Sequence, residues 1–140
     1  IGVGIKMATT STFSCKVISP EKAILECDAT FAAFPAHDGE MGILRDRAPL
    51  VCKLGIGVLR IESPEKTYTL FIDGGFAQVI ENKITFLTEQ ARFADSIDAT
   101  AADQAMIEAQ AMKITDDATF TARDKAMQRA QVQIKLSRSR

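Results

Sequence analysis

The chain has 140 residues, of which 46% are hydrophobic, and its formal net charge at pH 7 is −1. This apolar content excludes an intrinsically disordered chain, and the near-neutral charge argues against a nucleic-acid partner. The apolar runs are far shorter than the ~20 residues that a membrane-spanning helix needs, so we expect no direct insertion into a membrane.

We expect both ends of the sequence to be foreign to the natural chain. Met7 is followed by Ala-Thr-Thr, as at a natural start, so residues 1–6 are interpreted as added sequence. Residues 137–140 repeat Ser-Arg and receive the same interpretation. Residues 1–12 also lack the basic start and the apolar run of a signal peptide.

Up to about residue 90 the sequence has the pattern of a β-rich domain. Runs rich in β-branched and aromatic residues occupy 67–72, 76–80 and 84–88. Turn signals separate them, at 63–66 and at 81–83, where asparagine tolerates a positive φ. Short strands at this spacing predict a sandwich or a barrel.

After Ala94 the pattern changes to that of helices. Residues 95–98 offer N-caps, and 99–113 are rich in strong helix formers. Residues 115–117 interrupt this run with three more potential caps, and 118–136 are helical again in pattern. The short break predicts two helices that fold back on one another in an antiparallel hairpin.

Alanines recur at every fourth position in both expected helices, and we expect these two seams to face each other. They are Ala101, Ala105 and Ala109 in the first helix and Ala122, Ala126 and Ala130 in the second. Alanine buries little area, and burial stabilises by only ~25 cal/mol per Å². We therefore expect a marginally stable hairpin that can open or detach from the β-rich part.

The two expected helices differ in charge. Residues 94–114 are mainly acidic, whereas residues 118–140 carry six basic side chains against Asp124, namely Arg123, Lys125, Arg129, Lys135, Arg138 and Arg140. Such a helix is either a solvated face or a surface for a partner. With the whole chain near neutral, an acidic protein is the partner that this pattern favours.

No constellation of residues for catalysis or metal binding is visible. His37 is the only histidine, and it precedes Asp38-Gly39, a turn signal. The sequence contains no phosphate-binding or nucleophile-elbow motif. Asp73-Gly74-Gly75 is expected to form a hairpin or a bulge between strands. We therefore predict a non-catalytic protein without a metal site.

The three cysteines, Cys15, Cys27 and Cys52, are odd in number and include no Cys-x-x-Cys pair. This argues against a disulfide framework and against a zinc site. We interpret them as small apolar residues in a reducing compartment.

Five segments in order resemble the epsilon subunit of F-type ATP synthases, and the resemblance extends from about Phe13 to Leu136. They are Val17-Ile18-Ser19-Pro20-Glu21, then Gly39-Glu40-Met41-Gly42-Ile43-Leu44 with Ala48-Pro49-Leu50, then residues 54–61, then Gly74-Gly75-Phe76-Ala77-Gln78-Val79, and last Asn82-Lys83-Ile84-Thr85-Phe86-Leu87.

This resemblance implies an α+β fold, with a flattened β-sandwich of about ten strands over residues 11–92 and a regulatory helical hairpin over 93–136. It implies a non-catalytic subunit of the central stalk that couples rotation of the c-ring to the catalytic head. The helices would inhibit ATP hydrolysis when they extend along the gamma subunit to the alpha and beta subunits. The location would be peripheral, on the cytoplasmic face of the bacterial inner membrane or the stromal face of the thylakoid.

The resemblance also implies two contact sites on the sandwich. The residues that would contact the c-ring are His37, Asp38, Gly39, Glu40, Met41 and Gly42. The residues that would contact the gamma subunit are Arg47, Ala48, Pro49 and Leu50.

For the hairpin, the inhibitory residues would be Arg123, Lys125 and Arg129. Some family members bind ATP there, and the matching positions are Ile97, Asp98 and Arg129. Two arginines of that site are replaced by Ala101 and Gln133. Because arginine is well suited to bind phosphate, we predict that ATP binds weakly or not at all and that the chain has no cofactor.

Two other classes of protein fit the sequence. One is a free-standing β-sandwich adaptor with a helical tail, which would not bind a gamma subunit. The other is a small enzyme that uses His37 and Asp38.

Overall fold

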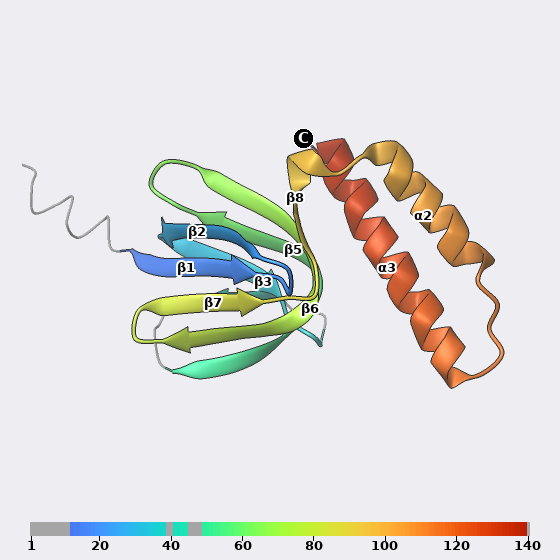
Figure 1. Cartoon of the computed structure of the whole chain (residues 1–140), viewed down its shortest axis with the longest axis horizontal. Helices are drawn as coiled ribbons and strands as arrows, with labels where there is room; N and C mark the ends of the chain where they lie inside the picture. Colours follow the sequence, from blue (N-terminus) through green and yellow to red (C-terminus); the bar gives the residue numbers. More distant parts are fainter. Residues whose placement is uncertain (1–11, 39–40, 45–48, 140) are drawn as a thin grey trace, which may run out of the picture.

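The structure is a computed structural model that describes residues 12–38, 41–44 and 49–139. Within these residues the chain forms a curved β-sheet followed by two antiparallel helices at one end of it (Figure 1). The elements are β1 (Phe13–Ile18), β2 (Ala23–Ala29), β3 (Phe31–Pro35), β4 (Met41–Leu44), β5 (Leu50–Glu62), β6 (Thr67–Ile80), β7 (Lys83–Leu87), β8 (Ala91–Phe93), the 3₁₀-helix η1 (Ala94–Ser96), α2 (Ala99–Ala111) and α3 (Asp117–Ser139).

The strands pair in the order β2-β1-β7-β6-β5-β3-β4, and β8 pairs with β6 beside this path. The pairs are antiparallel except for β1 and β7, which run parallel. The predicted fold class, a β-rich N-terminal part followed by a two-helix hairpin, is confirmed. Where about ten strands were expected, the described residues form eight.

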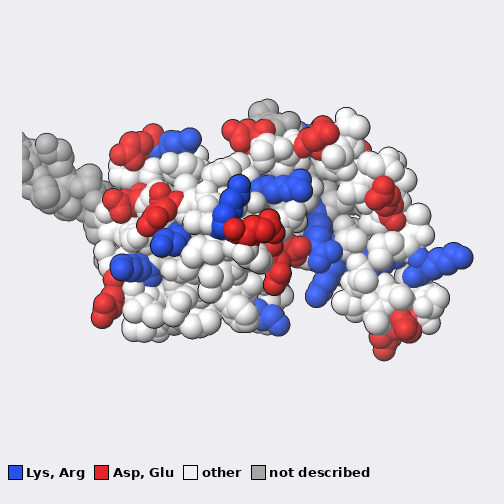
Figure 2. Space-filling model, viewed as in Figure 1, with Lys and Arg blue, Asp and Glu red and all other residues white. Residues whose placement is uncertain are grey.

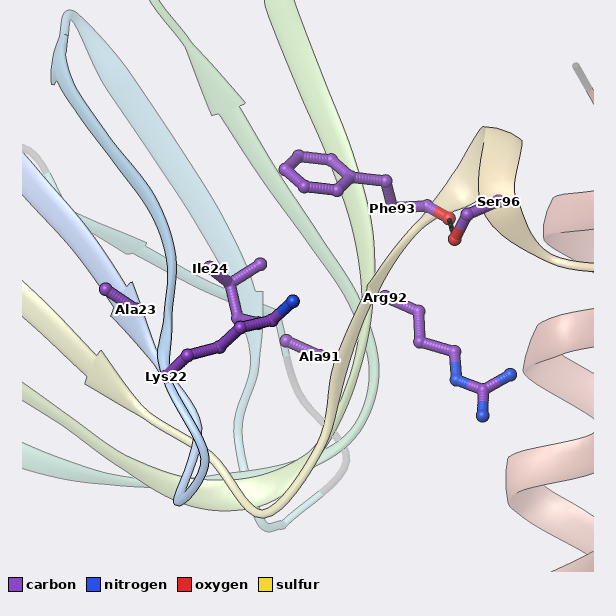
Figure 3. Close-up of a pocket in the computed structure, with 7 residues that line it drawn as sticks. All are labelled: Lys22, Ala23, Ile24, Ala91, Arg92, Phe93 and Ser96. Carbon is purple, nitrogen blue, oxygen red and sulfur yellow. Dashed lines mark hydrogen bonds between the residues drawn. The ribbon is translucent and has the colours of Figure 1, made fainter.

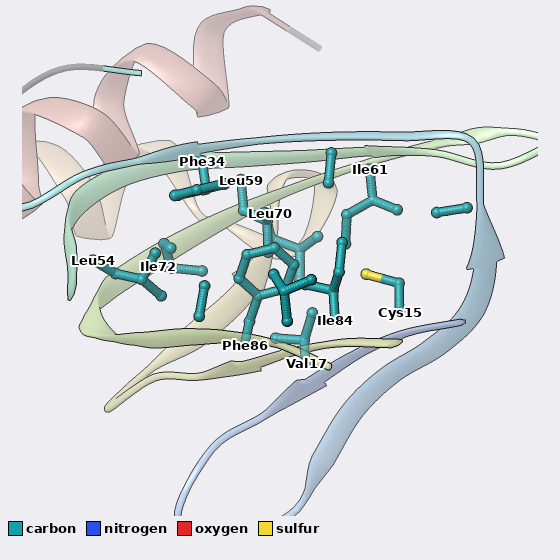
Figure 4. Packing of buried hydrophobic residues seen from close by; sticks show 14 of the residues in the cluster. Cys15, Val17, Phe34, Leu54, Leu59, Ile61, Leu70, Ile72, Ile84 and Phe86 are labelled. Carbon is teal, nitrogen blue, oxygen red and sulfur yellow. The ribbon is translucent and has the colours of Figure 1, made fainter. Parts of the chain in front are cut away.

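The sheet encloses its own hydrophobic core, whose side chains meet between its curved layers (Figure 4). The rings of Phe34 and Phe86 lie 5.8 Å apart between centroids, and Tyr68 packs near Phe93 at 6.5 Å. All members of this cluster lie between Phe13 and Phe93. The sandwich core is therefore complete without the helices.

The predicted turn between the sixth and seventh strands is confirmed. Glu81 and Asn82 connect β6 to β7, with φ angles of 44° and 64°. Two consecutive positive φ angles give a turn whose twist matches that of the flanking antiparallel strands. Asn82 also donates a hydrogen bond from Nδ2 to the Thr12 carbonyl at 3.1 Å, which fixes the turn beside the start of β1.

Strand β6 continues through Asp73-Gly74-Gly75, so this segment is an irregularity within a strand and not a hairpin. Gly74 and Gly75 have φ angles of 71° and 107°. Ile72 and Ala77 both belong to the sandwich core although they are an odd number of residues apart. The glycines therefore shift the inward and outward alternation of β6 by one residue.

Both helices begin at the aspartates that the sequence offered as caps. Asp98 Oδ1 accepts a hydrogen bond from the Thr100 N–H at 3.2 Å, at the start of α2. Asp116 Oδ1 accepts from the Thr119 N–H at 2.8 Å, and Thr119 Oγ1 accepts from the Asp116 N–H at 3.0 Å. These bonds satisfy N–H groups that the first helical turn leaves free. Helix α2 ends earlier than expected, and α3 runs on to Ser139.

The predicted alanine seams are correct in part. Ala109 and Ala130 are buried, whereas Ala101 and Ala122 are exposed and the buried alanine near the start of α2 is Ala102. Ala102 belongs to the buried cluster that also contains Ile97 and Leu136 of the hairpin and Phe71 of the sheet. The seam of α2 is therefore shifted by one residue at its start, where α2 joins this cluster.

Candidate functional site

The hairpin packs on the outer face of β5 and β6 through a small apolar contact. Its buried members are Phe71, Ile97, Ala102 and Leu136, bordered by Ile56, Val58, Ala94, Val132 and Ile134. Leu70 and Ile72, on either side of Phe71, point into the sandwich core instead. Three consecutive buried residues show that β6 is covered on both faces here, by its own core and by the hairpin.

Next to this contact an ion pair joins the hairpin to the sheet. Arg129 Nε of α3 donates to Asp73 Oδ2 of β6 at 2.7 Å. The side chain of Asp73 is only 17% exposed and that of Arg129 38%. A short, charge-assisted hydrogen bond with little access to water is stronger than an ion pair on the open surface.

The backbone at Asp73 is fixed by the segment that links β7 to β8. The Asp73 N–H donates to the Gln90 carbonyl at 3.1 Å and to Thr88 Oγ1 at 3.3 Å. Thr88 Oγ1 in turn donates to the same Gln90 carbonyl at 3.0 Å. The acceptor for Arg129 is therefore held in place by the sheet.

Below the apolar contact, sheet and hairpin leave an open groove of about 760 Å³. Beside His37, charged side chains of both signs line it, namely Lys53, Asp73, Glu89, Asp124, Lys125 and Arg129. Figure 2 shows acidic and basic side chains close together between the sheet and the helices. The contact between the two parts is thus apolar at one end and polar and hollow at the other.

The three basic residues expected to inhibit hydrolysis do not share one face of α3. Arg123 reaches across the hairpin, and its Nη2 donates to the Gln110 carbonyl in the last turn of α2 at 3.4 Å. Lys125 is exposed and lines the groove beside the sheet. Arg129 is paired with Asp73.

The residues matched to an ATP site have separate structural roles. Ile97 is buried under the hairpin. Asp98 caps α2. The guanidinium of Arg129 pairs with Asp73 rather than with Asp98.

The expected c-ring loop is described only in part. His37 and Asp38 are exposed in the turn after β3, and the His37 N–H donates to the Lys53 carbonyl at 3.0 Å. Met41 and Gly42 belong to β4. Gly39 and Glu40 lie outside the described residues.

Of the expected contacts to a gamma subunit, Pro49 is exposed and Leu50 begins β5, while Arg47 and Ala48 lie outside the described residues.

An apolar surface that the sequence analysis did not identify begins directly after Leu50. Val51, Phe76, Ile80 and Leu87 are exposed by 67%, 49%, 46% and 43%. Phe76 faces Leu87 across β6 and β7, and Val51 lies opposite Gln78 of β6. We call these four residues the apolar face. The sequence contains a signal for this surface. In β6 the inward residues Ala77 and Val79 are apolar, and so are the outward residues Phe76 and Ile80, whereas a strand with one face in water usually has polar outward residues.

A smaller hollow of about 400 Å³ lies between β2, β8 and η1, and Figure 3 shows its lining. Arg92 extends toward the helices, whereas the ring of Phe93 points the other way, toward the strands. The Ser96 hydroxyl donates to the Phe93 carbonyl at 2.8 Å, which closes the turn into η1. This hollow marks where the sandwich ends and the hairpin begins.

Burial raises the pKa values of two of the cysteine thiols. Cys15 is fully buried, and its pKa is raised from 9.0 to about 12, first by desolvation and then by Cys27. The pKa of Cys27 is also raised, chiefly by burial. Both thiols are free and face each other across β1 and β2. They are protonated at neutral pH and behave as apolar side chains.

Neither α2 nor α3, nor any other helix in the described part of the chain, is long and apolar enough to cross a membrane.

Relatives in solved structures share this fold. A chain of the mitochondrial ATP synthase of Euglena gracilis, from a structure of its OSCP, F1 and c-ring in rotational state 1, has a TM-score of 0.74 at 21% identity. The match covers 86% of this chain and 78% of that one. A chain of the central stalk and c-ring of the Tetrahymena thermophila mitochondrial ATP synthase has a TM-score of 0.66 at 12% identity. This second match covers 92% of this chain and 98% of the Tetrahymena chain.

The sequence comparisons are more specific. The model of the family described as ATP synthase, Delta/Epsilon chain, beta-sandwich domain matches residues 12–94. The ATP synthase epsilon chain of Rhodopirellula baltica is 38% identical over 124 residues, which are 89% of this chain and 97% of that protein. The epsilon chain of Symbiobacterium thermophilum is 37% identical over 125 residues, which are 87% and 90% of the two chains. The chain therefore belongs to the ATP synthase epsilon chain family and is a subunit of that complex.

Proposed function

We propose that this chain is a non-catalytic subunit of the central stalk, that its sandwich couples rotation of the c-ring to the catalytic head, and that its hairpin inhibits ATP hydrolysis. The observation that carries the proposal is the contrast between the two parts. The sandwich has a complete core between Phe13 and Phe93, whereas the hairpin is attached to it by a few side chains around Phe71. A rigid body with a weakly attached arm suits a subunit that couples and regulates.

The apolar face supports a permanent protein contact of the sandwich. An exposed group of large apolar side chains on neighbouring strands is typical of an interaction site. Val51 follows directly on Pro49 and Leu50, which the family resemblance assigns to the gamma subunit. We assign the apolar face to the gamma subunit as well.

The turn after β3 is the proposed contact to the c-ring. His37 and Asp38 are exposed there, and Glu40 follows. Exposed polar residues suit a contact with polar loops at the surface of a membrane protein, so the chain would remain peripheral to the membrane. Its proposed location is the cytoplasmic face of the bacterial inner membrane.

The hairpin is the proposed regulatory element. In the structure it is folded against the sandwich, and we assign this docked form to the state that permits hydrolysis. In the inhibitory state the helices would extend toward the alpha and beta subunits, where the basic side chains of α3 would meet acidic ones. Two packings of small free-energy difference are what a switch requires. No bound nucleotide is needed for this scheme.

Reconstitution tests the proposal. The chain is mixed with isolated gamma subunit and then with F1 that lacks its epsilon subunit, and complex formation and ATP hydrolysis are measured. We expect a stable complex with gamma and a lower rate of hydrolysis. If the chain does not bind gamma, the central-stalk assignment is wrong; if it binds but leaves hydrolysis unchanged, the inhibitory role is wrong.

A further inference from the structure

We propose that the Asp73–Arg129 ion pair holds the hairpin in its docked position and thereby withholds Arg129 from the acidic partner that it meets in the inhibitory state. The identity of that second partner rests on the proposed function above. The role of the ion pair in docking does not, because it concerns only groups within this chain.

The sheet presents Asp73 as a preformed acceptor. Its N–H is fixed by Thr88 and Gln90, and the positive φ angles of Gly74 and Gly75 follow immediately. Its side chain is only 17% exposed. A carboxylate with so little access to water is stabilised by a cation at hydrogen-bonding distance, and in the docked state Arg129 supplies it.

Arg129 connects the two parts of the molecule. Together with Ala126 and Ala130 it lines a hollow of about 430 Å³ between the helices. Its guanidinium leaves the hairpin and reaches Asp73 of the sheet with a separation of 2.7 Å between Nε and Oδ2. While its Nε is bound to Asp73, Arg129 cannot use the Nε edge of its guanidinium for a side-on bidentate contact with a carboxylate of another subunit.

The remaining contact is too small to make the ion pair dispensable. Among the described residues, the hairpin contributes three buried side chains to the cluster around Phe71, namely Ile97, Ala102 and Leu136, and alanine contributes little area. The open groove of about 760 Å³ beneath them adds no packing. The balance between the docked and released hairpin therefore depends on this ion pair, which release exchanges for water or for another carboxylate.

Docking is tested on the isolated full-length chain by hydrogen–deuterium exchange of α3. A released two-helix hairpin is marginal in water, so its amides exchange faster than in the docked form. We expect Asp73→Asn to accelerate exchange in residues 129–136 roughly tenfold, the equilibrium shift expected for loss of one charge-assisted hydrogen bond. The matched control is Glu89→Gln, because Glu89 lines the same groove but is exposed.

The charge swap separates a specific pair from a general electrostatic effect. Asp73→Arg and Arg129→Asp should each accelerate exchange, and the double variant should exchange more slowly than either single one. If Asp73→Asn exchanges like the wild type, or if the double variant is at least as fast as both single ones, the ion pair does not hold the hairpin.

Hydrolysis by the reconstituted complex tests the second half of the proposal. Asp73→Asn should lower ATP hydrolysis because more hairpin is released with Arg129 intact. Arg129→Gln should release the hairpin equally but inhibit less. Faster exchange with unchanged hydrolysis in Asp73→Asn would support the docking role and contradict the inhibitory function proposed for the hairpin. Unchanged exchange contradicts the docking role whatever hydrolysis does.

Discussion

Gly75 lies against the Leu87 backbone so closely that a Cβ atom at this position would overlap the Leu87 carbonyl oxygen. Its φ of 107° is also one that only glycine adopts readily. This contact is made at the irregularity of β6, two residues after Asp73, whose side chain binds the hairpin. This irregularity therefore depends on glycine for two independent reasons.

We predict that Gly75→Ala lowers the free energy of unfolding by at least ~3 kcal/mol or prevents folding, because overlap with backbone cannot be relieved by a side-chain rotation. Gly74→Ala is the control. It has a φ of 71°, but a Cβ atom there would lie 3.9 Å from the Leu54 carbonyl oxygen, an ordinary contact, so the substitution should cost only about 1–2 kcal/mol. Urea unfolding of both variants decides the matter, and equal losses would show that the contact with Leu87 is unimportant.

The apolar face should be required for assembly and not for folding. Phe76→Ser with Leu87→Ser removes the cross-strand pair at its centre. Since both side chains are about half exposed, the isolated chain should still unfold cooperatively, whereas its affinity for gamma should fall at least about tenfold. Binding is measured by titration with isolated gamma subunit.

Ile107→Gln provides the matched control for that experiment. Ile107 is 58% exposed, but on α2 of the hairpin. The control should bind gamma like the wild type. Equal binding by all three proteins would place the gamma contact elsewhere on the molecule.

Above pH 9 the buried thiol of Cys15 should make stability depend on pH. Its pKa is about 12 in the folded chain against an ordinary 9.0. Between these values the unfolded chain loses the proton and the folded chain keeps it, so stability falls as pH rises, by up to about 1.4 kcal/mol per pH unit. Below pH 9 this effect is absent.

Unfolding by urea between pH 8 and 10.5 measures the effect. The stability of Cys15→Ala should be lower at pH 8, because the substitution leaves a small cavity, but should decline less steeply with pH. Parallel curves for the two proteins would show that Cys15 does not titrate on unfolding in this range.

Much of the fold could be predicted because it is encoded by local signals. Glu81 and Asn82 mark a tight turn by type, and Asp98 and Asp116 mark helix starts. The prediction of the alanine seam was wrong at Ala101, since the buried residue there is Ala102. Periodicity shows which residues share a face of a helix but not which element that face contacts.

The candidate site was less accessible from the sequence. Arg129 was identified by resemblance, but its partner Asp73 is 56 residues away and belongs to a segment that the sequence marked only as a turn or bulge. The apolar face was also missed, since exposure of Phe76 depends on the phase shift at Gly74 and Gly75. Both features arise from tertiary geometry, which local patterns do not specify.

The most direct test of the account is removal of the hairpin after Phe93 in the reconstituted complex. All members of the sandwich core lie at or before Phe93, so the truncated chain should fold and bind gamma. It also carries Phe71→Thr, because truncation would otherwise expose the Phe71 ring to water. The measurement is the rate of ATP hydrolysis in membranes free of other inhibitors, beside full-length Phe71→Thr and wild-type chains. We predict that the truncated chain supports coupled proton pumping and a higher rate of hydrolysis than the wild type; an unchanged rate would contradict the inhibitory role of the hairpin.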